Sequence, residues 1–172
     1  MKKIAVILVS ILITACASSP KPAASVAPQA SNKTAPTADA TTAPVSTAET
    51  ESKRLAAEIQ ELQQQSVYFD FDKPAINAQY QDVILKQAQF IKEHNNDVVT
   101  VEGNADERGS KEYNLALGSR RAEAVEKSME ILGVQAKQIK VTSFGEEKPR
   151  LTCHEEKCWK ENRRADFVHN LG

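Results

Sequence analysis

The sequence contains few aromatic residues, and this scarcity narrows the possible functions. Phe, Trp and Tyr make up 5% of the 172 residues, and the formal net charge is −1. Nucleic-acid sites combine basic patches with interleaved aromatic side chains, and no such patch is present. A long sugar cleft would also need aromatic platforms. The composition therefore argues against a nucleic-acid partner and against a polysaccharide-cleaving groove.

Patterns typical of catalytic centres are also missing. No Ser-His-Asp, Cys-His or metalloprotease motif occurs in the chain. Four carboxylates could in principle supply an acid pair for glycoside cleavage, and these are Asp70, Asp72, Asp106 and Glu107. The histidines are scattered along the chain and are expected at the surface: His94, His154 and His169. We expect no catalytic residue, no metal and no cofactor.

Long apolar runs are absent as well. Lys2 and Lys3 precede one short apolar run, residues 4–13, which is typical of a secretory signal. A membrane-spanning anchor is the alternative, but a span needs about 20 apolar residues. The run therefore predicts export rather than a transmembrane helix.

The end of this run carries a more specific pattern. Ile13-Thr14-Ala15-Cys16 resembles the lipobox of bacterial lipoproteins. The resemblance implies that residues 1–15 are a signal peptide and that Cys16 is acylated after cleavage. Several acyl chains give firm anchoring. Ala17 and Ser18 are unlike the acidic signal for retention in the inner membrane, so we expect the periplasmic face of the outer membrane.

Two low-complexity or marginal segments follow. Residues 16–50 consist, after the lipidated cysteine, mostly of Ala, Ser, Thr and Pro, which cannot bury enough apolar surface to fold. They are expected to form a disordered tether. In residues 51–65 the spacing of Leu55, Ile59 and Leu62 predicts a short helical lead-in.

Residues 66–172 are expected to form one α+β domain. Apolar alternation predicts strands at 66–71, 98–102, 139–144 and 164–168, and apolar spacing of 3 and 4 predicts helices at 76–94 and 114–132. Residues 149–162 are expected to be mostly loop, with at most one helical turn. The order β-α-β-α-β-β predicts one mixed sheet of about four strands, with the helices packed on one face.

The second and third cysteines, Cys153 and Cys158, are separated by four residues. With His154 they would make an incomplete zinc set. An oxidising periplasm favours a disulfide between them, formed across a loop because side chains at i and i+5 of a helix point apart. We expect the disulfide rather than a metal site.

The stretch from Val101 to Ala122 carries the candidate site. Asp106 lies in the turn after a strand, and Arg121 lies in the following helix. The helix has an apolar face that Arg121 is expected to border, made of Leu115, Gly118, Ala122, Val125, Met129 and Leu132. A carboxylate and a guanidinium that converge on one cleft suit a zwitterion. A structural salt bridge between the two is the alternative.

Five ordered motifs carry a family resemblance. They are VYFDFDK at 67–73, VEGNADERG at 101–109, EYNLALGSRRAEAV at 112–125, SFGEEKP at 143–149 and NRRA at 162–165. They resemble the peptidoglycan-associated lipoproteins of the Tol–Pal system, which have an OmpA-like C-terminal domain. The resemblance implies non-covalent binding of peptidoglycan, through the zwitterionic end of meso-diaminopimelate in its peptide.

The resemblance also implies a role for individual residues. Asp106 would take the ammonium of diaminopimelate and Arg121 its carboxylate, while backbone donors would come from Phe71, Asp72 and Leu117. Asn104 stands where many members have histidine. For the Asn162-Arg163-Arg164 motif, a structural role across the last strand and contact with the ligand both remain open.

Finally, the resemblance implies partners. The outer membrane would hold the lipid at Cys16, peptidoglycan would hold the domain, and the periplasmic protein TolB would compete for an overlapping face during outer-membrane constriction in cell division. Two alternatives remain: an OmpA-like wall-binding lipoprotein outside the Tol system, and a wall hydrolase.

Overall fold

The computed structural model describes residues 45–172. Its elements are α1 (Val45–Gln63), β1 (Ser66–Tyr68), the 3-10 helix η1 (Ala78–Tyr80), α2 (Gln81–Glu93), β2 (Asp97–Asn104), α3 (Lys111–Ile131), the 3-10 helix η2 (Ala136–Gln138), β3 (Ile139–Gly145), α4 (Glu156–Asn162) and β4 (Arg164–Leu171). The expected signal peptide at 1–15, the lipidated Cys16 and most of the tether lie outside the described residues. Within 45–172 no helix is both long and apolar enough to cross a membrane.

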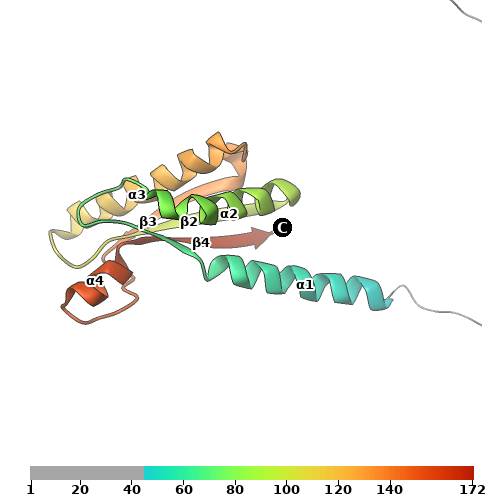
Figure 1. Ribbon diagram of the computed structural model, residues 1–172, viewed down its shortest axis with the longest axis horizontal. Coiled ribbons are helices and arrows are strands. Elements are labelled where there is room, and N and C mark those ends of the chain that lie inside the picture. The colour runs from blue at the N-terminus through green and yellow to red at the C-terminus, as the bar shows by residue number, and fades with distance from the viewer. Residues whose placement is uncertain (1–44) are drawn as a thin grey trace, which may run out of the picture. The chain divides into compact units, whose positions relative to one another are not determined.

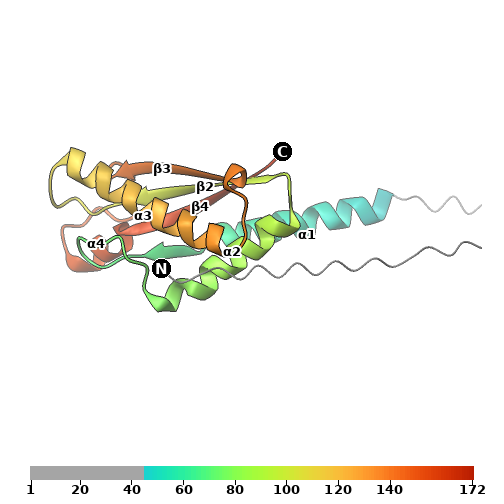
Figure 2. The same ribbon diagram turned by 90° about the horizontal axis from the view of Figure 1, so that it is seen from above.

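The four strands form one mixed sheet in the order β1-β4-β2-β3. β2 and β3 are parallel, whereas β4 is antiparallel to both β1 and β2. Helices α2 and α3 cover one face of this sheet (Figures 1 and 2). The α+β class and the single mixed sheet predicted from the sequence are confirmed.

The core lies between this face and the two helices. β2 alternates as expected, with Val99 and Val101 fully buried toward the helices and Thr100 on the opposite face only partly covered. α2 contributes Ile91 and α3 contributes Met129, and both side chains are fully buried. Burial of large apolar side chains of this kind stabilises the fold by about 1.5–3 kcal/mol each.

Helix α3 begins with a capping serine. The Ser110 hydroxyl accepts a hydrogen bond from the Tyr113 backbone N–H at 3.2 Å, and Gly133, with φ of 93°, follows the last turn. The expected buried face is correct at Gly118, Ala122, Val125 and Met129 but wrong at Leu115, whose side chain is 49% exposed. Arg121 does not border the buried face: it is fully buried. The close packing of Gly118 on Gly103 of β2 sets this rotation of the helix.

Helix α1 is longer than the expected lead-in at 51–65. It begins at Val45, inside the segment predicted as tether, and ends at Gln63. Alanine and glutamate favour helix in its first turns, and Lys53 Nζ pairs with Glu49 Oε1 at 2.8 Å one turn away. Its last turn is anchored to the domain, since the Leu62 side chain is buried and its carbonyl accepts a hydrogen bond from Gln87 of α2. The helix also packs against β4.

Strand β1 is shorter than expected. It ends at Tyr68 rather than Phe71, although the Phe69 N–H still donates to the Arg163 carbonyl at 2.9 Å. The chain then turns away from the sheet, and Asp72 adopts a left-handed φ of 56°. The expected helix from residue 76 likewise starts later, as η1 and then α2.

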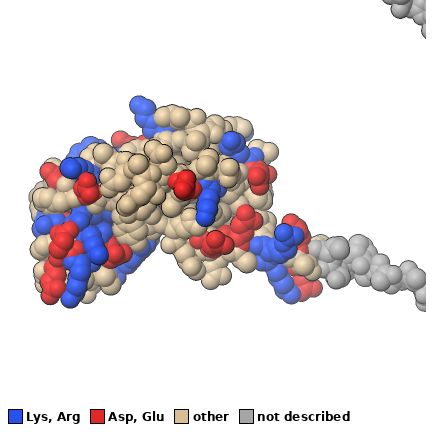
Figure 3. Space-filling model, in the orientation of Figure 1, with Lys and Arg blue, Asp and Glu red and all other residues tan. Residues whose placement is uncertain are grey.

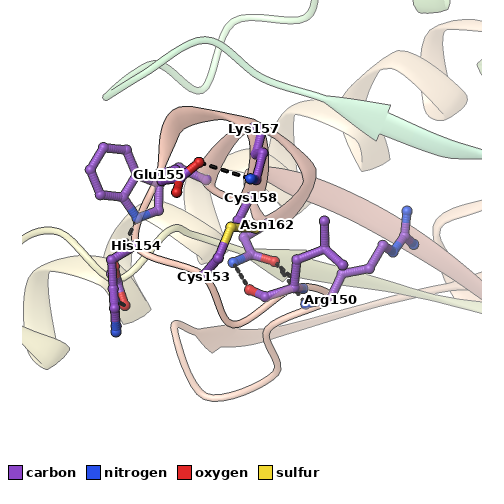
Figure 4. Close-up of a disulfide and its surroundings, with 10 residues drawn as sticks. Arg150, Cys153, His154, Glu155, Lys157, Cys158 and Asn162 are labelled. Atoms are coloured by element: carbon purple, nitrogen blue, oxygen red, sulfur yellow. Dashed lines mark hydrogen bonds and ion pairs between the residues drawn. A yellow bond between two sulfur atoms is a disulfide. The ribbon is translucent and has the colours of Figure 1, made fainter.

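Residues 153–162 form a disulfide-closed loop and the two-turn helix α4, where mostly loop was expected. Cys153 lies in the loop and Cys158 in α4, with 5.7 Å between their Cα atoms (Figure 4). The Asn162 side chain closes the preceding segment, because its Oδ1 accepts from the N–H groups of Arg150 and Leu151 at 2.8 and 3.0 Å. The disulfide and the hydrogen bonds of Asn162 therefore both connect the loop to α4.

His169 was expected at the surface and is instead buried. Its Nδ1 lies 2.6 Å from Asp97 Oδ2 and its Nε2 lies 2.7 Å from Gln87 Oε1. Gln87 in turn donates to the Leu62 carbonyl at 2.8 Å. This chain of polar contacts connects β4, β2, α2 and α1, and it explains why a polar side chain is accommodated inside.

Candidate functional site

A pocket of about 220 Å³ opens between the turn after β1, the turn after β2 and the first turns of α3. It is lined by Phe71, Asp72, Asp106, Arg108, Gly109, Tyr113, Asn114, Leu117 and Arg121. All five ligand-binding residues expected from the sequence line this pocket. Chain segments about 50 residues apart in the sequence are thus brought together in one place.

Arg121 lies at the inner wall of the pocket with none of its surface exposed. Its guanidinium donates to three backbone carbonyls: Nε to Lys73 at 3.1 Å, Nη1 to Asn104 at 2.7 Å and Nη2 to Asp70 at 3.1 Å. Burial lowers the pKa of Arg121 to about 10, so the group stays charged at neutral pH. A guanidinium has five N–H donors, and these hydrogen bonds use three of them.

Asp106 is the buried carboxylate of the pocket, with 4% of its surface exposed. It accepts hydrogen bonds from Arg108 and, at 3.2 Å, from Arg163 Nη1. Burial opposes ionisation, but these hydrogen bonds outweigh it and hold the pKa of Asp106 below its ordinary value. The carboxyl group is therefore an anion at neutral pH.

The sequence left open a structural salt bridge between Asp106 and Arg121. The structure pairs neither with the other: Asp106 binds two other arginines, and Arg121 binds backbone carbonyls. A carboxylate and a guanidinium thus line one pocket without neutralising each other directly. Such an arrangement has the charges needed for a zwitterion.

The turn after β1 contributes Phe71 and Asp72 to the lining of the pocket. Phe71 is 55% exposed, and the Asp72 carboxylate accepts a hydrogen bond from the Tyr113 hydroxyl. Within residues 45–172, the backbone N–H groups of Phe71 and Asp72 donate to no protein group. The left-handed conformation of Asp72 is uncommon for a residue other than glycine and tends to occur at functional sites. Both backbone donors are available to a ligand.

Leu117 plays a different part from the one expected. The sequence placed it near the start of the helix as a backbone donor, but α3 begins at Lys111. Leu117 is the seventh helical residue, so its N–H is used inside the helix. It lines the pocket with its apolar side chain, which is 4% exposed.

Sequence reasoning missed Arg108 and Trp159. The Arg108 guanidinium lies between the rings of Phe71 and Trp159, 4.0 and 4.1 Å from their centroids. Trp159 is carried by α4 and is fixed by a hydrogen bond from its Nε1 to Glu107 Oε1 at 2.8 Å. Charged side chains of both signs gather around α4 on the surface (Figure 3). The DERG string places Arg108 two residues after Asp106, but no pattern in the sequence indicates where the Arg108 side chain points.

In the Asn162-Arg163-Arg164 motif, Arg163 is the residue that contacts the lining of the pocket. Arg163 bridges Asp106, the Phe69 carbonyl and Glu156. Arg164 donates to Asp166 at 2.8 Å, and neither of these two residues lines the pocket. These contacts agree with the structural role that the sequence left open. No group of three or more His, Cys, Asp or Glu residues in the described part of the chain is placed to hold a metal ion.

Comparison with known proteins matches residues 68–164 to the OmpA family. Among curated relatives, a peptidoglycan-associated lipoprotein of Pasteurella multocida is 47% identical over 113 residues, which cover 64% of this chain and 75% of that protein. One from Agrobacterium fabrum is 46% identical over 102 residues, and the match spans 59% of this chain but only 58% of that relative.

Solved structures of related proteins support the same family assignment. The crystal structure of the peptidoglycan-associated lipoprotein from Burkholderia pseudomallei is 47% identical, with a TM-score of 0.61, and the match covers 62% of this chain and 90% of that one. The C-terminal domain of Helicobacter pylori MotB, at 21% identity and a TM-score of 0.59, covers 63% of this chain and 85% of that one and shows the fold alone. The chain belongs to the OmpA family, and within it to the peptidoglycan-associated lipoproteins.

Proposed function

We propose that this protein is an outer-membrane lipoprotein that binds the diaminopimelate-containing peptide of peptidoglycan without a covalent bond. It thereby tethers the outer membrane to the cell wall and has no enzymatic activity. The observation that carries this proposal is the pocket in which the Asp106 carboxylate and the Arg121 guanidinium are both buried and not paired with each other. The free end of diaminopimelate carries one ammonium and one carboxylate.

Each charged end of the ligand has a matching group in the pocket. The ammonium would bind Asp106, and the carboxylate would bind the two remaining N–H groups of Arg121 together with the free backbone donors of Phe71 and Asp72. Hydrogen bonds in which a partner is charged are the stronger ones, worth about 1.5–3 kcal/mol each. The names of the relatives, peptidoglycan-associated lipoproteins, support this choice of ligand.

The anchor and the partner complete the proposal. Acyl chains on Cys16 would hold the protein in the periplasmic face of the outer membrane. One small zwitterion offers few contacts, so each binding event would be modest, and many copies facing a repeating wall would add avidity. We place the protein in the Tol–Pal system, with TolB as a competing partner and a part in outer-membrane constriction during division.

A pull-down on purified cell-wall sacculi tests the proposal. Asp106→Asn keeps the size of the side chain and removes its charge, so we expect the fraction of protein that sediments with sacculi to fall, with an apparent affinity at least about tenfold weaker. Asp82→Asn, the same change at an exposed residue of α2 away from the pocket, should sediment like the original protein. Thermal unfolding would show that both variants are folded. A folded Asp106→Asn variant that sediments normally would contradict the assignment of the site.

A further inference from the structure

The Asp106 carboxylate has no accepting position left. Its Oδ1 accepts from the backbone N–H and the Nε of Arg108, at 3.1 and 3.2 Å. Its Oδ2 accepts from Arg108 Nη2 at 2.7 Å and from Arg163 Nη1 at 3.2 Å. An ionised carboxylate has about four lone-pair positions, and all four are used. A cation that enters the pocket can therefore bind Asp106 only by displacing one of these donors.

The two arginines differ in how firmly they are held. The Arg163 side chain is 7% exposed and is fixed by hydrogen bonds to the Phe69 carbonyl at 3.0 Å and to Glu156 Oε1 at 2.6 Å. The Arg108 side chain is 32% exposed and lines the pocket itself. Moving Arg163 away from Asp106 would disturb a buried guanidinium together with its hydrogen bonds to Phe69 and Glu156, which is costly. Arg108 is the donor that can leave.

Arg108 also has a second place to bind. Its Nη2, which donates to Asp106 Oδ2 at 2.7 Å, also lies 3.6 Å from Glu156 Oε2. The guanidinium lies over the rings of both Phe71 and Trp159, 4.0 and 4.1 Å from their centroids, and cation–π attraction acts within about 6 Å of a ring centroid. A short shift toward Glu156 keeps both an acceptor and an aromatic contact.

We propose that Arg108 is an internal competitor for the ligand's cationic group and so determines the specificity of the pocket. Without ligand, its guanidinium occupies the Asp106 carboxylate. With ligand, the ammonium takes that carboxylate and Arg108 moves toward Glu156 between Phe71 and Trp159. The proposal rests on the proposed function and adds the step that selects a ligand: a molecule with no ammonium cannot displace Arg108.

The test compares Arg108→Met with Arg120→Met in the full-length protein, titrated with a diaminopimelate-containing muropeptide. Methionine keeps an unbranched side chain between the two rings and removes the competing charge. We expect Arg108→Met to bind about three- to tenfold more tightly. Arg120→Met removes the same charge at an exposed residue. The Arg120 guanidinium lies 5.7 Å from the centroid of the Tyr113 ring and does not contact Asp106, so this variant should bind the muropeptide as the original protein does.

Trp159 provides an independent readout because it is the chain's single tryptophan. If the guanidinium slides along its ring, the ligand should change tryptophan emission in the original protein, and this change should disappear in Arg108→Met. Unchanged or weaker binding by Arg108→Met would overturn the competitor role, and weaker binding would mean that Arg108 contacts the ligand directly.

A failed proposal for function gives a different pattern. The function assigned to the pocket is wrong if the muropeptide binds neither the original protein nor Arg108→Met, or if it binds Asp106→Asn as tightly as the original protein. In either case the competitor role of Arg108 is wrong as well. If binding needs Asp106 but is the same in Arg108→Met, only the competitor role is wrong.

Discussion

Arg121→Ala is expected to lower the free energy of unfolding by about 3–5 kcal/mol, because a fully buried side chain would be lost and three backbone carbonyls, of which that of Asn104 is buried, would lose their donor. The guanidinium connects the turn after β1, through Asp70 and Lys73, to the end of β2, through Asn104. Its removal would also leave a cavity beneath the pocket. Urea unfolding of the two proteins measures the difference directly.

Arg120→Ala is the matched control for this change. Arg120 is the preceding residue of the same helix and is exposed, so its loss should change stability by less than about 0.5 kcal/mol. A cost below about 1 kcal/mol for Arg121→Ala would show that water replaces the guanidinium, and that Arg121 is not a structural anchor. If the cost is larger, Arg121 supports the fold as well as the ligand. Loss of ligand binding in Arg121→Ala then has two causes, and it does not by itself identify a contact between Arg121 and the ligand.

Gly103→Ala is the second change with a large expected effect. A Cβ on Gly103 would overlap the backbone carbonyl of Gly118, which cannot move without moving the whole of α3. We expect a loss of about 3 kcal/mol or more in the free energy of unfolding, since overpacking against backbone has no cheap relief. The shift of α3 would also displace Leu117 and Arg121, so ligand binding should weaken in any fraction that folds.

Gly172→Ala controls for the added methyl group. The nearest atom to its Cβ would be the Asn96 carbonyl oxygen at 3.7 Å, an ordinary contact, so stability should stay within about 0.5 kcal/mol. Urea unfolding and a muropeptide titration of both variants would measure the two effects. Near-wild-type stability of Gly103→Ala would mean that the contact between α3 and β2 is looser than the structure describes.

The strands of the sheet could be predicted because each has one buried face. Alternation of Val99 and Val101 with polar residues identifies β2, and the same kind of alternation identifies the other strands. The rotation of α3 could not be predicted in the same way. Apolar spacing placed Leu115 inside and Arg121 at the border, whereas the glycine contact with β2 turns the helix so that Arg121 is buried and Leu115 is exposed.

The candidate site was predictable where one short stretch of chain carries it. Asp106 and Arg121 belong to a single turn-helix unit, so their convergence on one pocket followed from the sequence. Trp159 comes from a helix some 50 residues later, and its approach depends on the disulfide-closed loop and on hydrogen bonds that no local pattern encodes. The burial of His169 likewise depends on Asp97 and Gln87, which are distant in the sequence.

The most direct test of the central claim, that the pocket holds the zwitterionic end of diaminopimelate, is a calorimetric titration of the full-length protein in detergent. It compares a diaminopimelate-containing muropeptide with a lysine-containing one. Lysine keeps the ammonium for Asp106 but lacks the terminal carboxylate for Arg121. The account predicts that the diaminopimelate form binds at least about tenfold more tightly. Equal binding of the two muropeptides, or binding of neither, would contradict it.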